Sequence, residues 1–211
     1  EANQYIPFSL DEVSLDFCVV GPHSQSLEDV DVLLAASRTE KVQDRQGLAE
    51  AVGMTATVVD IETHAARRAA ARLIAQLPHG GADALVGLLR IGSTTTDLQV
   101  LRNDELLFER GQGFGGAQLT QMLAQHYGFS IEEAEVKKRS GALPGDHARA
   151  VLQPFIQALC AEVMRALQFF FSSTSYPGVD QLLVFGGSAS LDGIAQALQA
   201  QVGVPVSVAN P

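Results

Sequence analysis

Apolar and polar positions alternate near the start of the chain, where every second residue from Val13 to Val19 is apolar. A period of two is typical of a strand with one buried face, and Gly21-Pro22 marks its predicted end. The run 30–36 is almost wholly apolar and predicts a central strand, and the run 55–59 predicts a third strand.

Helical spacing separates these strands. Residues 37–52 carry apolar positions at helical intervals that stop at Gly53, and the Ala- and Arg-rich segment 62–76 has apolar residues one turn apart. Pro78 and Gly80-Gly81 end this second predicted helix.

The pattern changes near residue 81. Three short strands are predicted in succession, with Asn103-Asp104 as a hairpin turn, and helices then alternate with two further strands. The chain is therefore predicted to be an α/β protein in two parts, 1–80 and 81–211. The predicted strands of the second part are 84–91, 96–101, 105–109, 179–185 and 205–208, and its predicted helices are 118–126, 130–139, 148–172 and 193–202.

Composition narrows the class of protein. With 46% apolar and 18% charged residues the 211-residue chain is predicted to be globular. A net charge of −10 argues against nucleic acid or an anionic membrane as a direct partner. No apolar run approaches the length of a membrane span, and no signal peptide is recognised. A chain that begins with Glu1 is expected to be a fragment or a processed product.

Cysteine and histidine give no sign of a metal centre. Cys18 and Cys160 lie far apart in apolar segments, which favours two buried, reduced thiols and a reducing compartment, although two cysteines could pair. The five histidines are scattered without ligand spacing, so we predict no metal site. We also predict no catalytic residue.

A glycine followed by four hydroxyl residues, Gly92 and Ser93–Thr96, lies between two apolar runs. Such a turn can direct backbone N–H groups and hydroxyls at a phosphate, although a plain hydroxyl-rich β-turn explains the same residues. A second glycine signal, Gly186-Gly187, follows the strand predicted to end at 185, and the two together suggest a nucleotide held between parts of one sheet. Asp97 is interpreted as a solvent residue at a strand edge, and 113–116 as a structural turn before a helix.

Longer segments resemble a known family. The stretch 114–144, FGGAQLTQMLAQHYGFSIEEAEVKKRSGALP, is the most specific of them. Other matching segments are EANQYIPFSLDEVSLDFCVVG, VLLAASRTEKVQDR, VVDIETHAARRA, IGSTTTDL and LLVFGGSASLDGI. They resemble the PilM family of type IV pilus assembly proteins, FtsA-related members of the actin-like ATPase superfamily.

The resemblance implies a two-lobed actin-like, ribonuclease H-like fold with ATP in the cleft between the lobes. It also implies that the first phosphate loop, before residue 1, and a terminal helix, after residue 211, are missing from this sequence. In the family pattern Gly92, Ser93, Thr94 and Thr96 face the nucleotide phosphates, and Gly186, Gly187 and Ser188 lie near the ribose and adenine. Glu135 and Lys138 flank the adenine, with a solvated i,i+3 pair as the equal alternative.

One position departs from the family pattern. The family usually has an acid two residues before the loop glycine, and Arg90 stands there. An acid would orient magnesium-bound water, whereas an arginine would only attract phosphate. Whether the protein is an enzyme is therefore left open, and ATP is predicted as cofactor with or without magnesium.

The family role implied is that of a cytoplasmic scaffold, linked to the inner membrane through its partner and relevant to twitching motility. It would bind the N-terminal cytoplasmic peptide of PilN in a groove that includes Tyr5, Phe8, Leu15 and Phe17, and couple it to assembly ATPases of the PilB and PilT class. Self-association is left open. The alternatives are an active actin-like ATPase and a nucleotide-free, GspL-type cytoplasmic domain of type II secretion.

Overall fold

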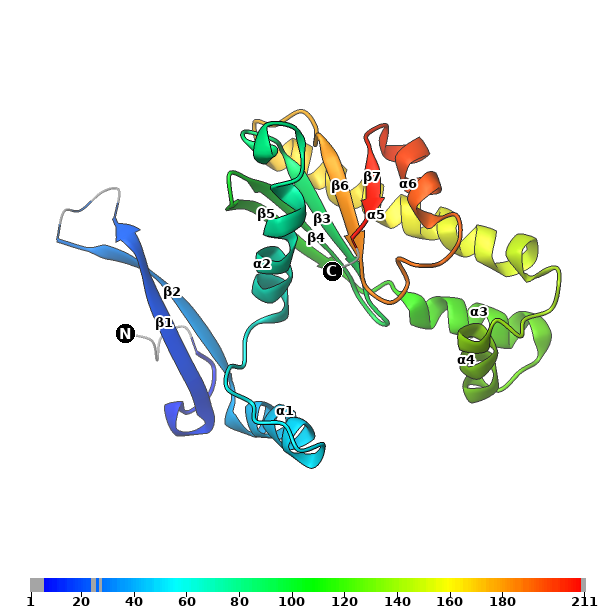
Figure 1. The fold of residues 1–211 in the computed structure, drawn as a ribbon, viewed down its shortest axis with the longest axis horizontal. Coiled ribbons are helices and arrows are strands. Elements are labelled where there is room, and N and C mark those ends of the chain that lie inside the picture. Colours follow the sequence, from blue (N-terminus) through cyan, green and yellow to red (C-terminus); the bar gives the residue numbers. More distant parts are fainter. Residues whose placement is uncertain (1–5, 24–25, 27, 210–211) are drawn as a thin grey trace. The chain divides into compact units, whose positions relative to one another are not determined.

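The computed structural model describes residues 6–23, 26 and 28–209, and its contacts divide the chain into two units, 1–65 and 66–211 (Figure 1). The division falls inside helix α2 (Glu62–Ile74), earlier than the predicted boundary at 80/81. The predicted boundary refers to the lobes of a complete actin-like fold, and it stays a prediction.

The first unit contains a two-stranded antiparallel hairpin and the helix that follows it. Its elements are β1 (Val13–Pro22), β2 (Val30–Arg38) and α1 (Thr39–Ala51). The register pairs Val13 with Arg38 and Phe17 with Leu34. The strand predicted to end at Gly21-Pro22 and the helix predicted to end before Gly53 are thereby confirmed.

Two strand predictions for this unit are wrong. Within the described part of the chain β2 pairs with β1 alone, so it is not a central strand. Residues 55–59 form no strand, and the described residues 54–61 contain no helix or strand. A short β-branched run becomes a strand only when a neighbour supplies its hydrogen bonds, and the sequence pattern carries no information about that neighbour.

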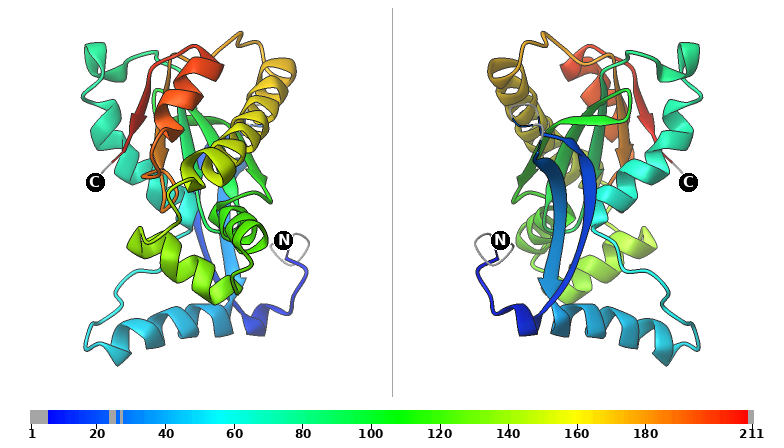
Figure 2. Two further views of the ribbon diagram at one scale, coloured as in Figure 1. Left: turned by 90° about the vertical axis from the view of Figure 1, so that its right-hand side faces the viewer. Right: turned by 90° about the vertical axis from the view of Figure 1, so that its left-hand side faces the viewer.

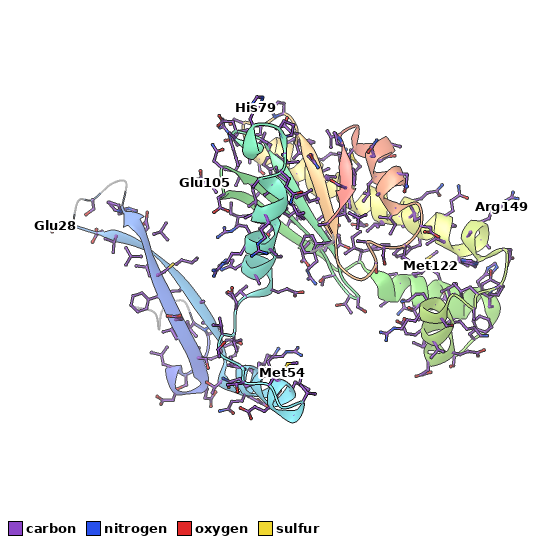
Figure 3. The ribbon with its side chains drawn as sticks, viewed as in Figure 1. Glu28, Met54, His79, Glu105, Met122 and Arg149 are labelled. Atoms are coloured by element: carbon purple, nitrogen blue, oxygen red, sulfur yellow. The ribbon has the colours of Figure 1, made fainter. Side chains whose placement is uncertain are left out.

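The hairpin is exposed on both faces. Neither β1 nor β2 has a buried residue; Phe17 is 63% exposed, and Leu33, which pairs with Cys18 on the other face, is 43% exposed. Figure 3 shows the side chains of the hairpin projecting to both sides of the ribbon. The predicted buried face of β1 is therefore wrong for this unit, as is the predicted burial of Cys18, which is exposed.

A five-stranded mixed sheet forms the centre of the second unit, in the order β5-β4-β3-β6-β7. The first three strands in sequence form an antiparallel meander, and β6 and β7 extend the sheet in parallel with β3. Positive φ angles at Asn103 and Asp104 confirm the predicted hairpin turn. The strands are β3 (Val86–Ile91), β4 (Thr96–Arg102), β5 (Glu105–Gln112), β6 (Gln181–Phe185) and β7 (Val206–Val208).

Helices cover both faces of this sheet (Figure 2). One face carries Leu89, Ile91 and Val184 and packs against α5 and α6, while the other carries Leu88 and Leu183 and packs against Ala70 of α2. All the helices predicted after residue 81 are confirmed, with bounds that differ by a few residues. They are α3 (Gly116–Tyr127), α4 (Ile131–Ser140), α5 (Gln153–Ser173), which follows a π-helical turn at Ala148–Leu152, and α6 (Ile194–Val202).

The long helix Ala148–Ser173 corrects one expectation from composition. It is long and apolar enough to cross a membrane, whereas the sequence pattern predicts no such segment. Its apolar side is buried in the core of the second unit, where Phe155, Leu159 and Phe170 have no exposed surface. Cys160 is buried on the same helix, as predicted, and burial raises the pKa of its thiol. The helix is thus a core element.

Candidate functional site

The two predicted glycine signals meet at one end of the sheet. β3 and β6 are parallel neighbours whose last register pair is Arg90 with Phe185, so Gly186 lies beside Ile91, the residue before Gly92. Gly186 has a φ of +100°, and a Cβ added there would lie 2.5 Å from the Ile91 carbonyl oxygen. Only glycine fits so close an approach with this backbone conformation. The two glycine-marked strand ends therefore lie next to each other, as their order in the sequence predicted.

The hydroxyl loop, which we define as residues 92–95, is a closed turn with exposed donors at its tip. The Thr95 carbonyl accepts a hydrogen bond of 2.9 Å from the Gly92 amide. Ser93 and Thr94 are exposed, and no hydrogen bond from either hydroxyl is found within the described residues. Thr96 differs, because it is buried and its hydroxyl donates to the Phe114 carbonyl at 2.7 Å. The Thr96 hydroxyl therefore fixes the backbone at Phe114 and does not face a ligand.

The first residues of α3 lie directly against this loop. The amides of Gly116 and Ala117 donate to the carbonyls of Gly92 and Ser93 at 2.9 and 2.7 Å. A Cβ on Gly115 would lie 2.6 Å from both of those carbonyl oxygens, and one on Gly116 would lie 2.4 Å from Ser188 Oγ. The glycines at 113–116 thus begin a helix, as predicted, and they also join the hydroxyl loop to the segment after β6.

A three-residue polar cluster connects α3 to α4. Lys138 Nζ lies 2.6 Å from Glu135 Oε2, 2.7 Å from Thr120 Oγ1 and 3.4 Å from the Gly116 carbonyl oxygen. The Thr120 hydroxyl lies 2.6 Å from Glu135, to which it donates while it accepts from Lys138. These hydrogen bonds, from Lys138 first, lower the pKa of Glu135 to about 2.

The alternative of a solvated pair is therefore wrong for Lys138, whose side chain is 17% exposed. The i,i+3 pair does form, but its main effect is to tie α4 to the helix that touches the hydroxyl loop. This places the ammonium group next to Gly116 and so near the loop. Sequence reasoning missed Thr120; a lone hydroxyl on the buried side of the predicted helix 118–126 was the available signal.

Asp97 also differs from its interpretation as a solvent residue. It is the cross-strand partner of Arg90, and the two side chains form an ion pair in which both are no more than about a fifth exposed. The same guanidinium donates to Thr95 Oγ1 at 3.0 Å. A four-residue loop between β3 and β4 fixes this register, so the pairing could have been found by counting from the turn.

The residues at this end of the sheet fit a nucleotide better than they fit magnesium. Exposed hydroxyls and a lysine are suited to bind phosphate. Glycines allow a ligand to approach the backbone closely. Gly187 leaves open space, since a Cβ there would meet nothing within 4 Å. In contrast, the carboxylates at the loop and at α4, Asp97 and Glu135, are both engaged by cations. In the part of the chain that the structure describes, no metal-binding group of three or more His, Cys, Asp or Glu gathers.

The predicted peptide residues lie in the first unit, apart from Tyr5, which is outside the described residues. The guanidinium carbon of Arg38 lies over the ring of Phe8, 4.3 Å from the ring centroid. Phe8 also borders a hollow at the base of the hairpin. Leu15 borders a second hollow, and Phe17 pairs with Leu34, which lines the first. The first hollow is lined by Ile6, Pro7, Phe8, Val13, Leu34, Ala36, Ser37, Arg38 and Ile61.

Comparison with solved structures shows the class of fold. The chain is similar to MreB5 of Spiroplasma citri bound to AMPPNP, with 16% identity and a TM-score of 0.54 over 82% of this chain and 60% of that one. It is also similar to Ta0583, an archaeal actin homolog, with 17% identity and a TM-score of 0.50 over 69% of this chain and 49% of that one. At this level of identity the likeness shows an actin-like ATPase fold.

The family follows from two closer matches. The profile of the family described as type IV pilus assembly protein PilM matches residues 1–211. A structure of the PilM-PilN type IV pilus biogenesis complex matches with 30% identity and a TM-score of 0.73, over 100% of this chain and 60% of that one. The chain belongs to the PilM family of type IV pilus assembly proteins, and it spans about 60% of the length of that solved relative.

Proposed function

We propose that this chain is part of a cytoplasmic scaffold of type IV pilus assembly that binds ATP at the hydroxyl loop. The observation that carries the nucleotide site is the convergence of four segments far apart in sequence: the hydroxyl loop, the start of α3, the segment 186–188 and Lys138 of α4. The MreB5 structure with the same fold contains AMPPNP, which supports a nucleotide as the ligand.

In this site the exposed Ser93 and Thr94 donate from the loop tip to phosphate oxygens. Gly186, Gly187 and Ser188 form the wall on the β6 side, where Gly187 leaves room for the ribose or base. Lys138 lies beside Gly116 at the start of α3, and Glu135 holds it there. Thr96 has an indirect part, because its bond to Phe114 fixes the start of β4.

For the partner, we propose the N-terminal cytoplasmic peptide of PilN, bound on the hairpin of the first unit. The solved relative is a PilM-PilN complex, and the exposed apolar hairpin offers Phe8, Leu15 and Phe17 beside two hollows. Binding to a membrane protein would place the scaffold at the inner membrane. From there it would link to assembly ATPases of the PilB and PilT class.

The test of the nucleotide site is a titration with a fluorescent ATP analogue. Ser93→Ala combined with Thr94→Ala removes two exposed donors and is expected to weaken binding by at least about tenfold, since hydrogen bonds to charged groups contribute about 1.5–3 kcal/mol each. Both side chains are exposed, so the double variant is expected to fold as the parent does.

The matched control is Ser172→Ala combined with Ser173→Ala. Among the residues that the structure describes, these two hydroxyls donate to carbonyls of their own helix, at the end of α5. This end of α5 lies near Tyr176 and Arg102, at the far end of the sheet from the hydroxyl loop. Unchanged affinity in the control with reduced affinity in the loop variant supports the site, and equal affinity in all three proteins would reject it.

A further inference from the structure

We propose that Arg90 masks the Asp97 carboxylate from divalent cations, so that the hydroxyl loop takes a nucleotide phosphate without magnesium. The part of this inference that concerns the nucleotide rests on the function proposed above. The part that concerns masking depends only on Arg90, Asp97 and the loop between them.

The geometry places the ion pair at the base of the loop. Arg90 is the penultimate residue of β3, and Asp97 is the second residue of β4. The two residues form a register pair between these adjacent strands. The guanidinium pairs with the Asp97 carboxylate and also donates to Thr95 Oγ1 within the loop. Both side chains are largely buried, so a hydrated cation has little access to the carboxylate oxygens.

The loop backbone lies directly against the same guanidinium. A Cβ added to Gly92 would be 3.0 Å from an Arg90 terminal nitrogen and 3.6 Å from its central carbon. The positive charge is therefore next to the turn whose tip carries Ser93 and Thr94. A guanidinium can offset the charge of a phosphate and donate to it, which is the part a divalent cation otherwise takes.

The two carboxylates described at this site, Asp97 and Glu135, are both engaged by cationic side chains, so magnesium finds neither of them vacant. It is usually held by one or two carboxylates together with substrate phosphates. Asp97 is occupied by Arg90, and Glu135 is occupied by Lys138 and Arg139 at 2.6 and 2.9 Å. Removal of the guanidinium would leave Asp97 as an uncompensated carboxylate beside the loop, and the site would then gain a ligand for the metal.

The experiment measures the affinity of the full-length protein for the fluorescent ATP analogue, once in MgCl₂ and once in EDTA. The parent is expected to bind equally in both, within about threefold. Arg90→Gln keeps an amide donor for Asp97 and Thr95 but removes the charge, so magnesium is expected to tighten its binding by about tenfold or more. Arg90→Lys keeps the charge and is expected to behave as the parent does.

The control is the double variant Arg90→Gln with Asp97→Asn, which has neither charge and is expected to lose the magnesium dependence of the single variant. A parent protein whose affinity falls about tenfold in EDTA overturns the proposal, whatever the variants do. So does an Arg90→Gln variant that folds, binds ATP and gains no response to magnesium.

A second readout needs no nucleotide. Mn²⁺ is added to the chain alone, and paramagnetic broadening of the amide signals of residues 92–95 is recorded by NMR. Broadening is expected in Arg90→Gln but neither in the parent nor in the double variant. If no protein binds ATP, the proposed nucleotide site fails while this comparison still decides the masking, and equal broadening in parent and Arg90→Gln overturns it.

Discussion

At the scale of single residues, the candidate site depends on glycines whose missing side chains allow segments to touch. Gly186 is the sharpest case, since its backbone adopts φ +100° against the carbonyl of Ile91. Gly187, the next residue, has no positive φ, and a Cβ added to it would have no neighbour within 4 Å. The two adjacent glycines thus have different roles. Gly186 allows close backbone packing, whereas Gly187 borders open space.

This contrast gives a stability prediction. Gly186→Ala is expected to lower the free energy of unfolding by about 2–4 kcal/mol, because a rigid backbone oxygen opposes the new methyl group and the φ is unfavourable. Gly187→Ala is expected to change it by less than about 0.5 kcal/mol. Urea unfolding followed by circular dichroism measures both, and equal stability of the two variants would contradict the packing argument.

At the scale of elements, α3 and α4 are held together by the cluster of Thr120, Glu135 and Lys138 rather than by an extensive apolar contact. Ala134 is the buried residue of α4, and the rest of that helix is largely polar. The cluster therefore fixes where Lys138 lies relative to the start of α3. Its strength depends on the charge of Glu135.

The pH dependence follows from the pKa of Glu135. Hydrogen bonds from Lys138 and Thr120 lower this pKa from 4.5 to about 2, so the folded state favours the ionised carboxylate. The stabilisation is complete above pH 4.5 and is lost as the pH falls towards 2. Parent and Glu135→Gln are expected to differ in unfolding free energy near neutral pH and to converge in acid.

Urea unfolding of the two proteins near pH 6 and about pH 3 measures this difference. Glu132→Gln is the control, because Glu132 is an exposed carboxylate in the first turn of the same helix. A gap between parent and Glu135→Gln that stays constant with pH would show that the ionised carboxylate does not hold the cluster.

At the scale of the whole molecule, the two units differ in how they are stabilised. The second has a sheet with a core on each face, whereas the first has a two-stranded hairpin without a buried residue. A hairpin of two strands is marginally stable by itself in water. Both faces of this hairpin carry exposed apolar side chains, and the peptide proposal rests on them.

The peptide proposal is tested on one face of this hairpin. Phe17→Ala is expected to weaken binding of the PilN N-terminal peptide by about tenfold or more, because an aromatic anchor loses its buried area. Leu33→Ala, which is also exposed but pairs with Cys18 on the other face, is the control and is expected to have little effect. Isothermal titration calorimetry measures both affinities, and an unchanged affinity for Phe17→Ala would remove that face from the binding surface.

Local sequence was enough to predict the elements of the second unit, the meeting of its two glycine signals and the family. These features depend on local periodicity, on residues that permit special backbone geometry and on spacing along one sheet. The peptide and nucleotide assignments of individual residues remain predictions.

What lies against each face of an element became known only from the three-dimensional packing. Asp97 is ion-paired instead of solvated, Thr120 joins a cluster, and Phe17 and Cys18 are exposed although their pattern predicted burial. A hydrophobic period shows which residues share a face of a strand, but burial and ion pairing depend on the neighbour that packs there. That neighbour comes from a distant part of the chain or from a partner, and no local pattern encodes it.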